Sequence, residues 1–353
     1  MKKFAPHIKD EMTPIERMKA MDEGKQYDRI PCVPLLGEPS TRLIGTTISE
    51  YWHSAKLLVE AEAAAFSRFG HDSVGVGPSA YGVAEAMGAH VVYPDDNIPY
   101  ISSPLITDYS MLDGMEPLNP HSSERMITFL HALEILKEVS SDVVGAGFSI
   151  AGPFTIASYL RGVDNILKDV YKNPEELHKL MQLVTESCNN CIAAASVFDI
   201  GVGFADPLAS GTVIGPNIFK EFVKPYIEQM IETAYKKTGN KPSIHMCGNT
   251  YSIWKYLAEF DISSLSIDNM VDIGRAKDEV GNKVCIMGNI DPTGIFMMGN
   301  KESIFSAVKE CIKKAGDSPK GLILSSGCQI PVNAPMENVD YFMEAARTVG
   351  KKL

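Results

Sequence analysis

The chain has 353 residues, of which 45% are hydrophobic, and it carries a formal net charge of -11 at pH 7. This length can bury a large core, either as two ordinary domains or as one barrel with insertions. The acidic balance argues against a nucleic-acid partner, because binding to a phosphate backbone draws on clustered Lys and Arg side chains.

The N-terminal segment, Met-Lys-Lys-Phe-Ala-Pro-His-Ile-Lys-Asp, has no apolar stretch of the kind found in signal peptides. No segment holds about 18 consecutive apolar residues, so we expect a cytoplasmic protein without a membrane partner. The seven cysteines are then expected to be reduced thiols rather than a disulfide framework. A helical extension is predicted at residues 13–23, before the first strand.

Eight apolar or small-residue runs predict strands, and several are continuous rather than alternating, as in strands buried on both faces. Segments with helical periodicity separate them, which is typical of βα units. The predicted strands are 30–36, 73–77, 143–150, 203–205, 243–246, 264–267, 284–287 and 322–324, and the predicted helices include 55–69, 124–139, 174–197, 216–238, 251–260, 301–315 and 336–349.

Residues 89–120 fit neither period and contain several turn residues, so we interpret them as an insertion, with a hairpin near the barrel mouth. Nothing along the chain marks a linker. We therefore predict a single (βα)8 TIM barrel over residues 1–353, in the α/β class, with the N-terminal helical extension.

The strongest functional pattern is His245 and Cys247, two residues apart at the end of a predicted strand, with Cys328 just after the last predicted strand. Positions i and i+2 of a strand point to one face, and the carboxyl ends of barrel strands meet at one mouth. Two Cys and one His leave one position of a tetrahedral zinc ion open, which is a catalytic rather than a structural ligand set. The alternative is a core histidine with two inert buried thiols.

Cys188 and Cys191 form a C-x-x-C pair, but they lie inside a predicted helix rather than at a helix start. We interpret them as core or surface thiols.

Together with these three residues, several segments in order along the chain resemble the uroporphyrinogen decarboxylase superfamily, and within it the zinc-dependent methylcobamide:coenzyme M methyltransferases. The matching segments are Thr13-Pro-Ile-Glu-Arg-Met, Ala151-Gly-Pro-Phe-Thr-Ile-Ala, Phe204-Ala-Asp-Pro-Leu-Ala-Ser-Gly, Phe219-Lys-Glu-Phe-Val-Lys-Pro, Met287-Gly-Asn-Ile-Asp-Pro and Ser325-Ser-Gly-Cys.

The resemblance implies that His245, Cys247 and Cys328 hold Zn²⁺, and that a methyl group moves between a corrinoid and a small thiol such as coenzyme M. The methylated corrinoid is expected on a separate corrinoid-binding protein, since this chain has no Asp-x-His-x-x-Gly segment of its own. Arg42 and Arg161 are candidates for holding the sulfonate of coenzyme M, or are ordinary surface residues. The chain itself is expected to be a monomer or a homodimer.

Three carboxylates also lie at predicted strand ends. The zinc-dependent methionine synthases, a second related group, have an acidic residue about twenty positions after His-x-Cys, and that position falls near Asp268. Asp268 is then a displaceable zinc ligand, an acceptor that orients His245, or a cap of the next segment. Asp206 and Asp291 line the pocket or cap the following helices.

Other functions stay open at this point. A decarboxylase of porphyrinogens would need several arginines for the substrate carboxylates, but the segment Leu35 to Arg42 supplies only Arg42. A methyltransferase that takes the methyl group from a methoxylated or methylamine donor would share the zinc and the corrinoid partner. A non-enzymatic scaffold would have a zinc site closed by a fourth ligand.

Overall fold

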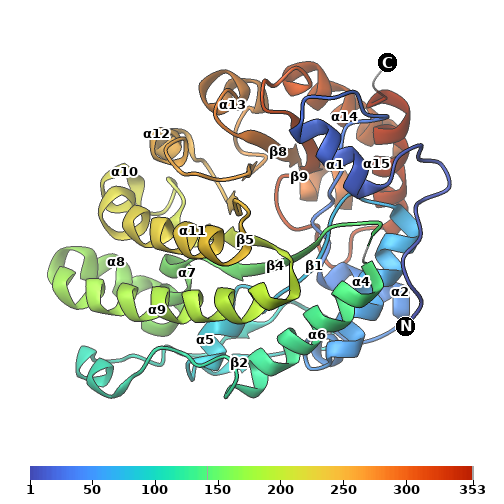
Figure 1. Cartoon of the computed structure of the whole chain (residues 1–353). Helices are drawn as coiled ribbons and strands as arrows, with labels where there is room; N and C mark the ends of the chain where they lie inside the picture. The colour runs from blue at the N-terminus through green and yellow to red at the C-terminus, as the bar shows by residue number, and fades with distance from the viewer. Residues whose placement is uncertain (141, 352–353) are drawn as a thin grey trace.

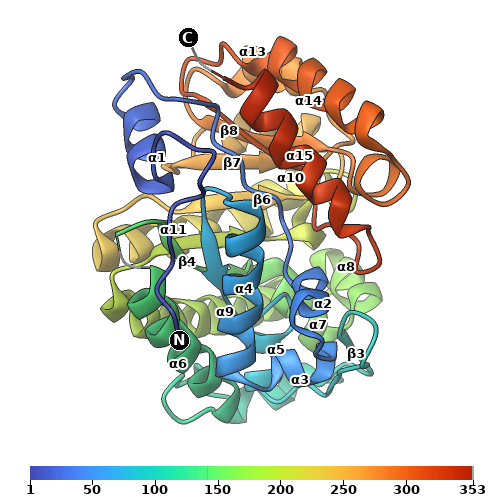
Figure 2. The ribbon, with the colours of Figure 1, turned by 90° about the vertical axis from the view of Figure 1, so that its right-hand side faces the viewer.

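The computed structural model describes residues 1–140 and 142–351, and its centre is a seven-stranded sheet in the order β1-β4-β5-β6-β7-β8-β9. All neighbouring strands are parallel. The strands are β1 (Val74–Val76), β4 (Ala146–Ala151), β5 (Gly201–Ala205), β6 (Ser243–Met246), β7 (Ser264–Ile267), β8 (Cys285–Ile290) and β9 (Leu322–Ser326). The sheet curls, with helices on its outer side (Figures 1 and 2). This architecture confirms the predicted barrel class.

Residues 30–36, predicted as the first strand, form no regular strand. Cys32 makes an isolated parallel bridge with Leu324 of β9, and its carbonyl accepts a hydrogen bond from Asp72 N–H at 2.9 Å, just before β1. The two prolines of this segment have no N–H, so a continuous ladder of hydrogen bonds cannot form. The segment therefore takes the eighth place, between β9 and β1, as an extended chain.

The helices return the chain across the outside of the sheet, and α9 lies beside α11 and α14 beside α15 (Figure 1). The longer helices are α1 (Pro14–Asp22), α4 (Ala55–Phe69), α6 (Glu124–Ser140), α7 (Pro153–Arg161), α8 (Val163–Lys172), α9 (Pro174–Ala195), α11 (Lys224–Thr238), α13 (Ile273–Val280), α14 (Lys301–Ala315) and α15 (Met336–Val349). The short ones are η1 (Glu38–Ser40), α2 (Thr41–Ile44), α3 (Ile48–Trp52), α5 (Gly82–Ala86), η2 (Tyr109–Gly114), η3 (Ser196–Phe198), η4 (Pro207–Ala209), α10 (Gly215–Ile218), η6 (Tyr251–Ile253) and α12 (Trp254–Leu257). Two π-helical turns complete the set, η5 (Phe219–Val223) and η7 (Pro292–Met297).

The predicted helix over residues 216–238 is divided into α10, η5 and α11. Pro225, near the start of α11, has no N–H to donate to the preceding turn, so an uninterrupted α-helical ladder cannot form there.

Residues 89–120 contain a small antiparallel sheet of β2 (Val91–Val92) and β3 (Tyr100–Ile101). Tyr93, directly after β2, is held against the body of the protein by Arg125 of α6, whose Nη2 donates to the Tyr93 hydroxyl at 2.6 Å. The expected hairpin is therefore present in this stretch, and its role as a cover of the mouth stays a prediction.

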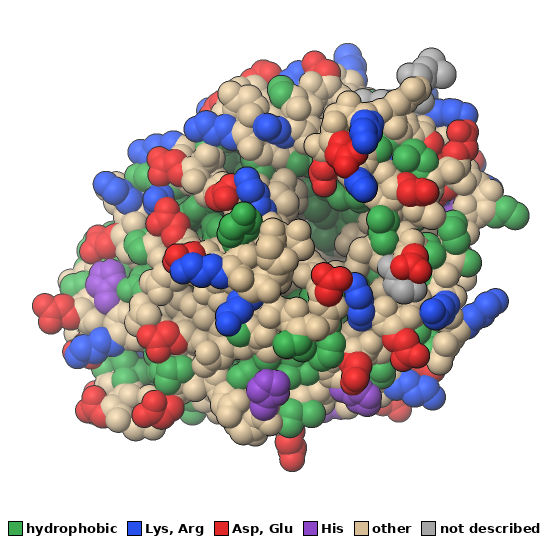
Figure 3. All heavy atoms as spheres, viewed as in Figure 1, with side chains coloured by type: hydrophobic (Ala, Val, Ile, Leu, Met, Phe, Trp, Pro, Cys, Tyr) green, Lys and Arg blue, Asp and Glu red, His purple; other side chains and the backbone are tan. Residues whose placement is uncertain are grey.

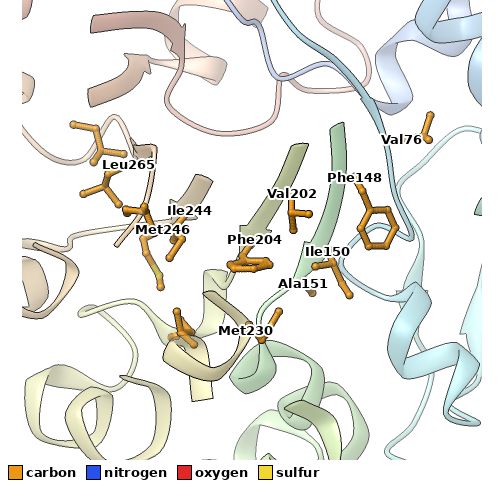
Figure 4. Packing of buried hydrophobic residues seen from close by; sticks show 14 of the residues in the cluster. Val76, Phe148, Ile150, Ala151, Val202, Phe204, Met230, Ile244, Met246 and Leu265 are labelled. Atoms are coloured by element: carbon orange, nitrogen blue, oxygen red, sulfur yellow. The ribbon is translucent and has the colours of Figure 1, made fainter. Parts of the chain in front are cut away.

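The main core lies between the sheet and its helices. Figure 4 shows side chains of successive strands packed in this layer, including Phe148 of β4, Phe204 of β5 and Ile244 of β6, with Met230 of α11 against them. These four side chains are at most 2% exposed. Every residue of β7 and β9 is buried, as expected for central strands of a parallel sheet covered on both faces.

The surface carries charges of both signs. Figure 3 shows Lys and Arg interspersed with Asp and Glu on one face, and a hollow near its centre with hydrophobic side chains inside it. Among the described residues, no helix combines the length and the apolar character needed to cross a membrane.

A buried ion network ties the N-terminal segment and α15 to the barrel. Arg17 of α1 and Asp72 beside β1 are both fully shielded from solvent, and Arg29 donates to Asp72 at 2.6 Å. Arg347 of α15 donates to Asp10 at 2.9 Å. The members of this N-terminal ion network are Asp10, Arg17, Asp28, Arg29, Asp72 and Arg347.

We expect this network to make the protein sensitive to acid. Burial alone raises the pKa of Asp10, but hydrogen bonds from Arg29 and Arg347 outweigh it and hold that pKa well below its usual range. A carboxylate with a lowered folded-state pKa adds stability above the unfolded pKa of about 4, and this stability is lost as the pH falls further. Melting temperatures measured between pH 7 and pH 2 should therefore fall less steeply for Asp10→Asn than for the unmodified protein. Asp340→Asn, which alters an exposed ion pair, should show the same fall of melting temperature with pH as the unmodified protein. Equal falls for all three proteins would contradict the role of Asp10 in the acid sensitivity.

Candidate metal centre

Strand β6 positions the first two residues of the candidate metal centre. His245 lies in β6, opposite Ala205 of β5 and Ser266 of β7, so the sheet register fixes its backbone on both sides. Cys247 follows β6 directly, and its side chain points to the same face as His245, as the i, i+2 spacing predicts. Both side chains are partly buried.

Cys328 joins them from the loop after β9. His245 Nε2 lies 3.1 Å from Cys247 Sγ, and Cys247 Sγ lies 3.6 Å from Cys328 Sγ. The three ligand atoms all lie within 4.8 Å of one another. Tetrahedral zinc with ordinary bond lengths sets about 3.6 Å between nitrogen and sulfur ligands and about 3.8 Å between two sulfurs. The donor set and its spacing therefore fit this ion.

The orientation of the His245 ring also fits a metal ligand. Nδ1 lies 2.9 Å from Ser266 Oγ, and Ser266 is 4% exposed. In the neutral tautomer that carries its proton on Nδ1, Nδ1–H donates to this hydroxyl and leaves the lone pair of Nε2 facing the two sulfur atoms.

Ser266→Ala should therefore weaken metal binding without removing a ligand. We expect zinc affinity to fall by about 10- to 100-fold, the usual cost of losing a partner that orients a metal-bound histidine. Competition with a chromogenic chelator measures this change. Ser263→Ala, which removes a hydroxyl just before the start of β7, is the matched control, and equal zinc affinities for both variants would contradict the role of Ser266.

The two thiols differ in their ionisation. The hydrogen bond shared with Cys247 and the nearby His245 lower the pKa of Cys328, although burial opposes this shift. The same hydrogen bond, together with burial, raises the pKa of Cys247. A divalent cation at this site would displace the remaining thiol protons, because thiolates rather than thiols bind metals.

Asp268, at the end of β7, holds the turn after Cys247. Its carboxylate accepts a hydrogen bond from Gly248 N–H at 2.8 Å and another from Met270 N–H at 2.8 Å. The acceptor beside His245 is Ser266 rather than Asp268. Asp268 is 8% exposed, and a role as a displaceable zinc ligand stays a prediction.

The Asp206 side chain binds the N-terminus of helix α7, earlier in the chain, and makes no capping hydrogen bond to η4, which follows it, whereas Asp291 caps the helix that follows it. Asp206, after β5, accepts hydrogen bonds from Thr155 N–H at 2.8 Å and from Thr155 Oγ1 at 2.6 Å, at the N-terminus of α7. Burial raises the pKa of Asp206 to about 6, while these hydrogen bonds oppose the rise. Asp291 caps η7 by accepting hydrogen bonds from the N–H groups of Thr293 and Gly294 at 2.9 Å each.

The two candidate arginines are engaged elsewhere in the structure. Arg42 Nη1 donates to the carbonyl of Ala334 at 2.7 Å, in the loop that carries Cys328. Arg161 Nε pairs with Asp169 at 2.8 Å, and its guanidinium lies over the ring of Tyr109. Their contacts are therefore with loop carbonyls, a carboxylate and a ring rather than with the metal centre.

The sequence reasoning did not single out a pair of tyrosines near the centre. Tyr81 and Tyr159 stack with their ring centroids 4.8 Å apart. Burial raises the pKa of Tyr159, with smaller contributions from Tyr81, Asp206 and Cys247. Tyr159 lies in α7, which begins in one of the segments that resemble the family, and this resemblance was the available signal.

Residues 13–349 match the family model described as Uroporphyrinogen decarboxylase (URO-D). The chain belongs to this family. A uroporphyrinogen decarboxylase from Trichodesmium erythraeum is 28% identical over 268 residues, covering 72% of each chain. The recognised superfamily is thereby confirmed.

Other family members with wide coverage are methyltransferases. The methylcobamide:CoM methyltransferase MtbA of Methanosarcina acetivorans is 27% identical, covering 96% of this chain and 98% of its own. A methylated-thiol–coenzyme M methyltransferase of Methanosarcina mazei is 23% identical, covering 96% and 90%. The solved structure of a methyltransferase from Methanosarcina mazei superimposes with a TM-score of 0.85 at 22% identity, covering 95% and 98%, which establishes the shared fold.

Proposed function

We propose that this protein is a zinc-dependent methyltransferase that moves a methyl group between a corrinoid and a small thiol, for which coenzyme M is the first candidate. The observation that carries the proposal is the convergence of His245, Cys247 and Cys328 within 4.8 Å at the carboxyl ends of parallel strands. Relatives that act on methylcobamide and coenzyme M extend over almost the whole chain, which supports the same chemistry here.

The residues of the centre are suited to activating a thiol. When bound, zinc would lower the pKa of a substrate thiol, and the two cysteine thiolates would offset the metal charge so that the substrate sulfur stays nucleophilic. Ser266 keeps Nε2 of His245 available through its hydrogen bond with Nδ1. Asp268 holds the turn at Gly248 and thereby the position of Cys247.

In the proposed reaction, the substrate thiol gives up its proton to solvent water, and its sulfur attacks the methyl carbon of the methylated corrinoid. The new sulfur–carbon bond forms as the cobalt–carbon bond breaks, and cobalt keeps the electron pair. No group of the protein has to remove a proton from carbon. The corrinoid is expected on a separate protein that docks at the mouth.

The decarboxylase alternative draws its support from the family and from the relative in Trichodesmium erythraeum. A substrate with several carboxylates needs several cationic side chains at the mouth. Arg42 is the only cation in the segment 35–42, and it already donates to the carbonyl of Ala334. We therefore favour methyl transfer to a thiol over decarboxylation as the function of this protein.

The test uses the zinc-loaded protein with methylcobalamin and, in separate reactions, coenzyme M, homocysteine and tetrahydrofolate. The absorption spectrum of the corrinoid reports demethylation. We expect demethylation with one thiol, and its loss in Cys328→Ser. No demethylation with any acceptor, despite bound zinc, would contradict the proposal and favour a methyl-donor-side enzyme, a decarboxylase or a scaffold.

A further inference from the structure

The three residues of the metal centre are not held with equal firmness. His245 belongs to β6 and Cys247 follows it directly, so the sheet fixes both backbones. Cys328 lies two residues beyond the end of β9, in a loop. Its position therefore depends on what holds the residues on either side of it.

The residue after Cys328 is held by a buried carboxylate. Gln329 Nε2 donates to Glu38 Oε2 and also to the carbonyl of Leu36 at 3.1 Å. The next residue, Ile330, donates its N–H to the carbonyl of Leu35 at 2.8 Å. Hydrogen bonds thus connect the Cys328 loop to residues 35–38, at the end of the extended segment that takes the eighth place of the barrel.

Glu38 is an unusual residue to find in this place. It is 5% exposed, and no lysine or arginine of the described residues forms an ion pair with it. Burial raises the pKa of its carboxyl group, while hydrogen bonds with its own backbone N–H, with Gln329 and with Trp52 oppose the rise. A carboxylate buried without a cation lowers stability, so a purely structural role would be served better by an apolar side chain.

The backbone at Gly37 leaves room for the contact between Glu38 and Gln329. Gly37 has a φ of +73°, and a Cβ atom added there would lie 2.9 Å from Gln329 Nε2. A larger residue at position 37 would therefore push the amide away from the carboxylate.

We infer that Glu38, acting through the side chain of Gln329, is the positioning residue that keeps the Cys328 sulfur within reach of the metal. The inference rests on the proposed metal centre and assigns to it a residue outside the ligand set. Glu38 does not bind the metal in this scheme. It fixes the loop, so that the third ligand is in place before the ion binds.

Cobalt(II) titration tests the inference, because thiolate-to-cobalt absorption reports how many thiolates bind the ion. In Glu38→Ala, we expect the affinity to fall by about 10- to 100-fold, as for other partners that orient a ligand. The thiolate absorption per bound ion should fall below that of the unmodified protein, since a loosely held Cys328 would bind the ion in only part of the molecules. Glu60→Ala, which removes a partly exposed carboxylate on α4, should behave like the unmodified protein.

A swapped pair separates positioning from simple loss of stability. Gln329→Glu alone places two carboxylates side by side and should weaken cobalt binding, because like charges repel. Combining it with Glu38→Gln restores one donor and one acceptor, and should recover most of the affinity and the absorption. Comparing Gln329→Glu with the double variant tests the positioning role of Glu38 even if Glu38→Ala fails to fold.

Unchanged thiolate absorption and affinity in folded Glu38→Ala and Gln329→Glu would overturn the inference and leave the metal centre intact. Absence of thiolate absorption in the unmodified protein would overturn both. Full thiolate-to-cobalt absorption in the unmodified protein, without any methyl transfer, would count against the proposed function alone. The positioning role of Glu38 would still be supported if the double variant recovers cobalt affinity and absorption.

Discussion

Cys328→Ser should lower the affinity for zinc by more than about 100-fold, beyond the 10- to 100-fold lost when a partner of a ligand is removed. Cys328 supplies one of three donor atoms in the centre and has the lower pKa of the two thiols. A serine hydroxyl cannot replace it, because it is a far weaker acid than a thiol and does not ionise near neutral pH. Chelator competition at pH 7 measures the affinity.

The control for this prediction is Cys285→Ala, which removes a buried thiol that lies outside the metal centre. It should bind zinc as the unmodified protein does. Equal zinc affinities for Cys328→Ser and Cys285→Ala would mean that Cys328 is not a ligand.

Arg17→Met should lower the free energy of unfolding by about 3–5 kcal/mol, the usual cost of removing one partner from a buried ion network. Arg17 is fully buried, with its Nε 2.7 Å from Asp28, and its other nitrogens bond to Asp72 and to a backbone carbonyl. Methionine fills much of the same volume but leaves both carboxylates short of a cation. Urea denaturation monitored by circular dichroism measures the change.

The matched control is Arg68→Met. Arg68 pairs with Asp340 at 2.6 Å, but both side chains are 38% exposed, and an exposed pair contributes only about 0–1 kcal/mol. If the two arginine variants lost the same amount of stability, the N-terminal ion network would not be a major source of stability.

The barrel class and the convergence of the three candidate ligands were predictable from the sequence because both depend on local spacing. The His245 and Cys247 side chains share a face by the two-residue period of a strand, and Cys328 comes near them because parallel strands end at one mouth. The prediction of a regular strand at residues 30–36 was wrong. It rested on the apolar side chains of this segment, but its two prolines have no backbone N–H, so a regular ladder of hydrogen bonds cannot form.

What the sequence could not supply is the set of contacts that hold the centre in place. Ser266 meets His245 only through the register between β6 and β7. Glu38 and Gln329 are 291 residues apart along the chain, and nothing local to either residue predicts their contact. Contacts of this kind form only in the tertiary structure, so they cannot be predicted from a single sequence.

We propose that His245, Cys247 and Cys328 hold zinc and leave one position for a substrate thiol. X-ray absorption at the zinc edge, measured on the zinc-loaded protein with and without coenzyme M, gives the ligands of the ion in both states. We expect one nitrogen and two sulfur ligands from the protein, with a third sulfur when the thiol is added. A fourth protein ligand that coenzyme M does not displace, or an unchanged sulfur count, would contradict it.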